Sequence, residues 1–146
     1  MAIDKSKYEQ ARDLILSGQA SGLNVSADQT AINTQILMDS LKSGTVIDPQ
    51  YFFVTGVDVN HRDRETLGTL LHIAAAYGVR SVIRLILKDE STDYLKQDFK
   101  KRYPSELAYE VARDFAVGRL LLKKEMHQAG RRIIYGPDAG KIIIGK

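Results

Sequence analysis

The chain has 146 residues, of which 44% are hydrophobic, with a net charge of +3 and no cysteine. This length allows one domain that buries about two thirds of its unfolded surface, and the lack of cysteine excludes disulfides and thiolate chemistry. The opening residues carry acids where a signal peptide has an apolar core, and no run approaches about 18 apolar residues, so we expect a cytoplasmic protein without a membrane segment.

The charges are unevenly distributed along the chain. Residues 1–60 hold four Lys and Arg against seven Asp and Glu, whereas residues 61–146 hold 17 against 11. Beyond residue 95 there are 12 basic and six acidic residues. This asymmetry favours an acidic partner, and a solvated basic face is the alternative.

Two amphipathic stripes predict the first helices. The first ends near Gly18 and is followed by a polar loop over residues 19–27, and the second runs from Asp28 to Gly44. Their apolar positions are Tyr8, Ala11, Leu14 and Ile15 in the first, and Ile32, Ile36, Leu37 and Leu41 in the second.

Asp48 and Pro49 resemble an N-cap followed by proline at the first helical position, which predicts a short helix that ends at Gly56. Farther along, residues 68–87 predict two short antiparallel helices separated by Gly78, with Thr69 as the N-cap of the first. Two helices of this length cannot bury both of their faces against each other, so this unit needs neighbours stacked on its sides.

The segment GVDVNHRD at residues 56–63, followed by residues 69–87, resembles the ankyrin repeat, which joins a glycine-led turn, a TPLH-type helix start and an apolar second helix. A second copy follows at a spacing close to the 33 residues of that family. Asp58 and Asp63 recur 35 residues later as Asp93 and Asp98, and LLHIA at residues 70–74 recurs 34 residues later as PSELA at 104–108.

Both copies depart from the ankyrin pattern. The first has Leu70 in place of the motif proline and one extra residue before Thr69, which displaces Gly68 towards the helix. The second has Lys101 where the turn glycine is expected, and an inserted residue near 113–117, so we expect it to act as a capping repeat. It also carries Tyr103 for the motif threonine, Glu106 for the histidine and Ala112 for the glycine between helices.

We therefore predict an all-α, ankyrin-like stack over residues 1–132, with the clearest repeats at 56–90 and 91–125 and degenerate units in 1–55. Residues 133–146 predict a short β-hairpin, with strands at Ile133–Tyr135 and Ile142–Ile144 around the turn cluster GPDAG. The alternatives for this segment are a disordered tail and a strand that pairs with another chain, which would make a dimer of an otherwise monomeric protein.

Candidate chemistry is sparse. The resemblance implies that His72 is structural and bonds backbone groups between neighbouring repeats. His61 is expected to be an exposed contact residue at a turn tip, and His127 is isolated. The spacing shows no zinc site, and GPDAGK at residues 136–141 is one residue too short for a phosphate-binding loop. We expect no catalytic residue, metal or cofactor.

The resemblance implies a non-catalytic protein-binding module that uses the concave face of its repeats, with Tyr77, Phe99 and Arg102 as the main anchors. The contact positions that it implies are Arg64, Glu65, Ala76 and Tyr77 in the first copy, and Phe99, Lys100, Arg102, Glu110 and Val111 in the second. Leu67 is a further candidate, although the extra residue leaves its register open.

The basic C-terminal half supports an alternative function, which is binding to nucleic acid or to an acidic partner. Aromatic side chains interleaved with cations are typical of nucleic-acid platforms. The cations are Lys96, Lys100, Lys101 and Arg102, and the aromatic residues are Tyr94, Phe99 and Tyr103.

Overall fold

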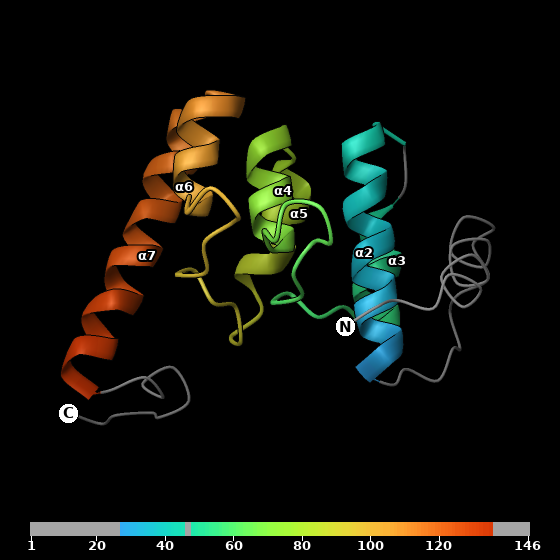
Figure 1. The fold of residues 1–146 in the computed structure, drawn as a ribbon, viewed down its shortest axis with the longest axis horizontal. Helices are drawn as coiled ribbons and strands as arrows, with labels where there is room; N and C mark the ends of the chain where they lie inside the picture. The colour runs from blue at the N-terminus through green and yellow to red at the C-terminus, as the bar shows by residue number, and fades with distance from the viewer. Residues whose placement is uncertain (1–26, 46–47, 136–146) are drawn as a thin grey trace.

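The computed structural model describes residues 27–45 and 48–135, which form helices and connecting turns (Figure 1). No strand occurs among these residues, as the predicted all-α class requires. The elements are α2 (Ala27–Ser43), α3 (Pro49–Thr55), α4 (Leu70–Tyr77), α5 (Arg80–Leu87), α6 (Pro104–Leu107), the π-helical η1 (Ala108–Ala112) and α7 (Phe115–Tyr135).

The helices stand in three groups side by side (Figure 1). Helices α2 and α3 form one group, α4 and α5 the middle group, and α6, η1 and α7 the third. One apolar core runs through all three, because Phe52, Leu71 and Leu121 are each at most 1% exposed and belong to different groups. The middle group therefore has a neighbour on each side, which meets the requirement for stacked partners.

Helix α2 is buried on its polar side as well as its apolar side. Asn33, Thr34 and Gln35 are 0% exposed. The Asn33 amide donates to the Gly56 carbonyl at 3.0 Å, and the Thr34 hydroxyl accepts from the Asp58 backbone N–H at 2.8 Å. Buried polar groups need such partners, so α2 determines where the segment after α3 lies.

The predicted helix boundaries around α3, α4 and α5 are confirmed. The Asp48 carboxylate accepts from the Gln50 N–H at 3.0 Å, and α3 ends at Gly56. Gly78 follows α4 with a left-handed φ of 69°. Thr69 stands at the N-cap of α4, but its backbone N–H and hydroxyl both reach the His72 ring, at 3.0 and 2.9 Å.

The residue that was expected to be inserted near 113–117 is accommodated within η1, just before those positions. The left-handed residue that ends this inner helix is Arg113, with φ 56°, which is 35 residues after Gly78 rather than 34. The Asp114 N–H reaches back to the Ala108 carbonyl at 2.9 Å. A π-helical turn accommodates one extra residue without interrupting the backbone hydrogen bonds.

The turns before α4 and α6 share one closing backbone hydrogen bond and one residue with positive φ. Asp63 N–H donates to the Gly68 carbonyl at 2.7 Å, and Asp98 N–H to the Arg102 carbonyl at 3.1 Å. The residue with positive φ is Leu67 (60°) in the first turn and Lys101 (61°) in the second. The extra residue of the first turn thus lies within residues 64–66, and Leu67 takes the conformation that glycine was expected to take.

The predicted hairpin is wrong in its first strand. Residues 133–135 instead continue α7, which runs to Tyr135. The second predicted strand, at residues 142–144, and the first predicted helix, near residues 8–18, lie outside the described residues. Within the described part of the chain, no helix is both long and apolar enough to cross a membrane.

Candidate functional site

His72 joins α4 to the turn of the next group. Its Nδ1 accepts from the Thr69 N–H at 3.0 Å, and its Nε2 lies 2.9 Å from the Arg102 carbonyl, to which it donates. The ring is 1% exposed, and burial lowers the pKa of His72 although the Arg102 carbonyl acts in the opposite direction. This geometry confirms the predicted structural role, because both ring nitrogens are occupied by backbone partners.

The turn before α4 is fixed to α2 by a buried carboxylate. Asp63 is 0% exposed and accepts from the Gln35 amide at 2.7 Å and from the Lys42 ammonium at 2.9 Å. Its second oxygen accepts from the Thr66 N–H and hydroxyl. Burial opposes ionisation of Asp63, but the hydrogen bonds from Gln35, Lys42 and Thr66 outweigh it and bring the pKa to about 2.

Lys42 occupies a position that a metal ion could otherwise take. Carboxylate oxygens of Asp39, Asp63 and Glu65 lie within 4.8 Å of one another. The Lys42 ammonium lies 3.5, 2.9 and 2.8 Å from these three groups. Burial alone would lower the pKa of Lys42, but the hydrogen bonds to Glu65 and Asp63 raise it above its usual value. The three carboxylates therefore already share a cation that the protein itself supplies.

His61 differs from its expected position as an exposed contact residue. It is half-buried, and its Nε2 lies 3.1 Å from the Gln35 Oε1 on α2. Burial also lowers its pKa. His61 thus packs the turn against α2. His127, in contrast, is exposed on α7.

Neighbouring turns are connected to each other by polar contacts. The Phe99 N–H donates to the Thr66 carbonyl at 2.8 Å. The Arg62 guanidinium donates to the Leu67 carbonyl at 2.9 Å and to the Gln97 carbonyl at 2.8 Å. These bonds hold residues 62–67 of one turn beside residues 97–99 of the next, so side chains on the two turns share one surface.

Three of the predicted contact residues form ion pairs within the fold. Arg64 lies 2.9 Å from Asp39, and Glu65 is bound to Lys42. Arg102 donates to the buried Asp98 at 3.0 Å. Arg102 therefore stabilises the turn, because its loss would leave the buried Asp98 carboxylate without its cation.

The other predicted contact residues are mostly exposed. Tyr77 is 54% exposed, Phe99 55% and Val111 54%. Lys100 and Glu110 are also exposed, whereas Ala76 is half-buried. Leu67 is 47% exposed and lies beside Phe99. The structure therefore brings two apolar groups to the surface: Leu67 with Phe99 at the turns, and Tyr77 with Val111 at the far ends of α4 and η1.

The contributions of α2 and α7 were not predicted from the sequence. Gln35 and Lys42 reach into the turn before α4, and their spacing of seven residues on one helix face was the available signal. Glu125 of α7, only 5% exposed, accepts from the Ser105 N–H at 2.9 Å and its hydroxyl at 2.6 Å. Burial raises the pKa of Glu125.

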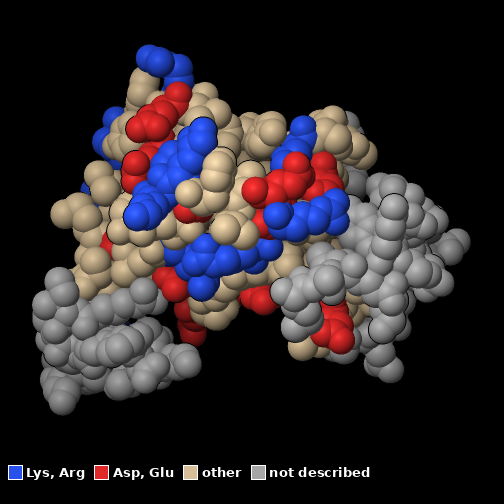
Figure 2. All heavy atoms as spheres, in the orientation of Figure 1, with Lys and Arg blue, Asp and Glu red and all other residues tan. Residues whose placement is uncertain are grey.

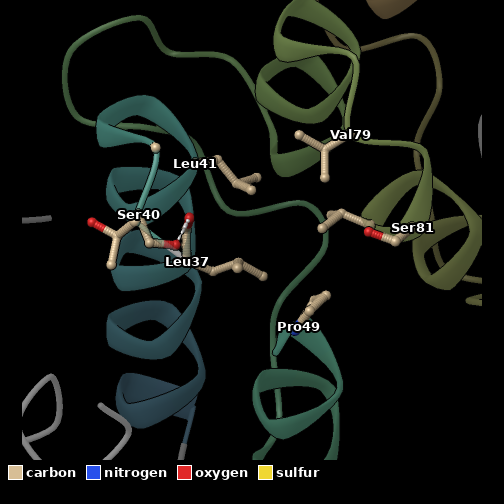
Figure 3. Close-up of a pocket in the computed structure, with 9 residues that line it drawn as sticks. Leu37, Ser40, Leu41, Pro49, Val79 and Ser81 are labelled. Atoms are coloured by element: carbon tan, nitrogen blue, oxygen red, sulfur yellow. Dashed lines mark hydrogen bonds between the residues drawn. The ribbon is translucent and has the colours of Figure 1, made fainter. Parts of the chain in front are cut away.

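A cavity of about 220 Å³ lies between α2, α3 and the α4–α5 junction. Figure 3 shows Leu37, Leu41 and Val79 pointing into it, while the Ser40 hydroxyl is bonded to the Leu37 carbonyl. Among the residues that the structure describes, no titratable side chain lines it: Leu37, Ser40, Leu41, Gly44, Thr45, Pro49, Val79, Ser81 and Val82. These described walls offer shape and apolar contact.

The face that carries the turns has mixed charge. Figure 2 shows Lys and Arg gathered over its middle, bordered by Asp and Glu. At the turns, the ion pairs of Lys42 with Asp63, of Arg64 with Asp39 and of Arg102 with Asp98 join opposite charges. No protein-family model, curated protein or solved structure matches this chain.

Proposed function

We propose that the chain is a non-catalytic protein-binding module of the ankyrin-repeat type, which contacts its partner through the turns and the inner helices α4 and α6. The observation that supports this most strongly is the exposure of Tyr77, Phe99 and Val111, each more than half exposed, on segments with firmly held backbones. Aromatic side chains such as Tyr and Phe are enriched at interfaces, and tyrosine is frequent among the residues that dominate binding energy.

The rigidity of the surface favours this function. The turn before α6 is bonded to the preceding turn through Phe99, and to α4 through His72. A surface that is already ordered loses little conformational entropy when a partner binds. The repeat interpretation is supported by the matching turns, by His72 in its bridging position, and by the left-handed residues Gly78 and Arg113 after the two inner helices.

Affinity capture from the native lysate tests the proposal. The immobilised chain is compared with Tyr77→Ala/Phe99→Ala, and with the control Arg84→Ala/Lys88→Ala, which alters exposed residues of α5 and its end. We expect a partner that is retained by the wild type and the control and lost by the first variant, with unchanged circular dichroism. Equal retention by all three proteins would exclude this face.

A further inference from the structure

Leu67 adopts an unusual backbone conformation for its position. It combines a left-handed φ of 60° with an exposed fraction of 47%. This conformation is unfavourable for a residue with a branched apolar side chain, and an exposed leucine gains little from burial within the fold. Lys101, at the matching place in the next turn, has nearly the same φ but a polar side chain. Backbone outliers of this kind justify a functional hypothesis.

Phe99 provides a second apolar group on the neighbouring turn, which is bonded to the residue before Leu67. Its N–H is bonded to the Thr66 carbonyl, and its ring is 55% exposed. The Lys100 ammonium lies 5.5 Å from the centre of that ring. Arg62 holds the Leu67 carbonyl and the neighbouring turn together. An apolar pair is therefore presented on two turns that are fixed to each other.

The charges around this pair are predominantly positive. The nearby acids are already engaged, Asp63 and Glu65 by Lys42 and Asp98 by Arg102. Arg64 pairs with Asp39. Within the described part of the chain, the remaining four cations on these two turns form no ion pair. We call the apolar pair with these four cations the turn patch: Leu67, Phe99, Arg62, Lys96, Lys100 and Lys101.

We propose that the turn patch binds an acidic peptide segment that places an apolar side chain between its carboxylates. This inference rests on the proposed protein-binding function and names the chemistry of the partner. The carboxylates would meet Lys100 and Lys101, and the apolar side chain would cover Leu67 and Phe99. Complementary charge of this kind increases the rate of association and the specificity of an interface.

Other occupants fit the turn patch less well. A second copy that presents the same patch would bring like charges together. Residues 136–146 contain one acid and two lysines, so they lack the required negative charge. A nucleic acid could stack on Phe99 and contact the cations, but it would leave the aliphatic Leu67 without a suitable partner.

Selection of peptides from a phage-displayed library of random dodecapeptides tests the proposal. We expect the wild-type chain to enrich peptides of net negative charge that contain Leu, Met, Phe or Trp between acids. A fluorescein-labelled copy of the best peptide should bind Phe99→Ala, and also Lys100→Glu/Lys101→Glu, at least about tenfold more weakly, as loss of an interface anchor does. Arg84→Ala should change its affinity less than about twofold, because Arg84 is an exposed residue of α5 outside the turn patch.

A second pair of variants tests whether binding needs the apolar side chain of Leu67 or only its left-handed backbone conformation. Asparagine accepts a left-handed φ, so Leu67→Asn removes the apolar group and keeps the turn. Arg113→Asn, at a left-handed residue outside the turn patch, is the matched control. We expect Leu67→Asn to weaken binding several-fold. An unchanged affinity for both Leu67→Asn and Phe99→Ala would overturn the proposal.

Three further outcomes would also overturn it: no enriched peptide, enrichment of neutral or basic peptides, or tight binding of an oligo-dT strand with no peptide bound. The lysate experiment distinguishes a failure of the turn-patch proposal from a failure of the proposed protein-binding function. A captured partner that is lost on Tyr77→Ala but retained by Phe99→Ala would leave protein binding intact and reject the turn patch as its site.

Discussion

Gly118 of α7 lies under the ring of Tyr109 from η1. A Cβ atom placed on Gly118 would be 2.8 to 2.9 Å from three ring atoms of Tyr109. Gly130 in the same helix has open space instead, with nothing within 4 Å of the point that a Cβ atom would occupy. The close approach of α7 to η1 therefore depends on the absence of a side chain at residue 118.

Replacing these two glycines should have opposite effects. Gly118→Ala should destabilise the fold by about 1–3 kcal/mol, because the Tyr109 ring must move. Gly130→Ala should stabilise it by up to about 1 kcal/mol, since alanine favours a helix. Urea denaturation of both variants provides the measurement, and equal shifts in the midpoint would contradict the packing described for Tyr109.

His72→Ala should lower the free energy of unfolding by about 1–3 kcal/mol, because the Arg102 carbonyl and the Thr69 N–H lose their buried partner. His127→Ala, an exposed change on α7, is the control and should alter stability by less than about 0.5 kcal/mol. Chemical denaturation at neutral pH measures both, and similar values for the two variants would show that the His72 bridge contributes little.

His72 should make the fold less stable as the pH falls. Burial lowers the pKa of His72 below its ordinary value of 6.5, so the unfolded chain binds a proton more readily than the folded one. The free energy of unfolding should be unaffected by His72 well above that value and should decrease as the pH falls through it. His61 has the same direction, whereas the raised pKa of Glu125 acts oppositely.

Denaturation of the wild type and of His72→Asn at several values between about pH 7.5 and 5.5 isolates this contribution. The wild type should lose more stability over that range than the variant, because the asparagine does not titrate. Parallel profiles would mean that the pKa of His72 is the same in the folded and unfolded chains.

Lys42→Met should destabilise the fold by about 3 kcal/mol, because the buried Asp63 loses the cation that faces it. Lys88→Met, at an exposed position after α5, is the control. Because Asp39, Asp63 and Glu65 would then face one another without the ammonium, added Ca²⁺ should recover part of the lost melting temperature in the Lys42 variant alone. A variant as stable as the wild type would contradict the assigned role of Lys42.

Local chemistry made much of the fold predictable. The two ends of α3 are marked by Asp48 and Pro49 and by Gly56. These signals depend only on neighbouring residues, and the helix between them forms as expected. His72 was placed correctly from the motif around it. The error at residues 133–135 has a physical reason: Ile and Tyr favour strands only weakly, and these residues follow an uninterrupted helix from Phe115.

Contacts between segments that are far apart in the sequence could not be predicted from such local signals. The positions of Gln35 and Lys42 against Asp63 depend on how α2 meets a turn that is 28 and 21 residues away in the sequence. Arg102, in contrast, was predicted as a contact residue although it pairs with Asp98 only four residues earlier in the same turn. Exposure of Phe99 and Tyr77 could be expected, but their separation into two apolar groups required the structure.

The wide turn of η1 also indicates where the length of this chain can vary. Because the residues between Ala108 and Asp114 already hold one more residue than the α4–α5 junction, removing one should tighten the turn and leave the face that α7 presents to α6 unchanged. A deletion inside α4 would instead rotate every later side chain of that helix by about 100°, taking its buried residues out of the core. We therefore expect a change in length to be tolerated at this boundary and to disrupt the core in the middle helices.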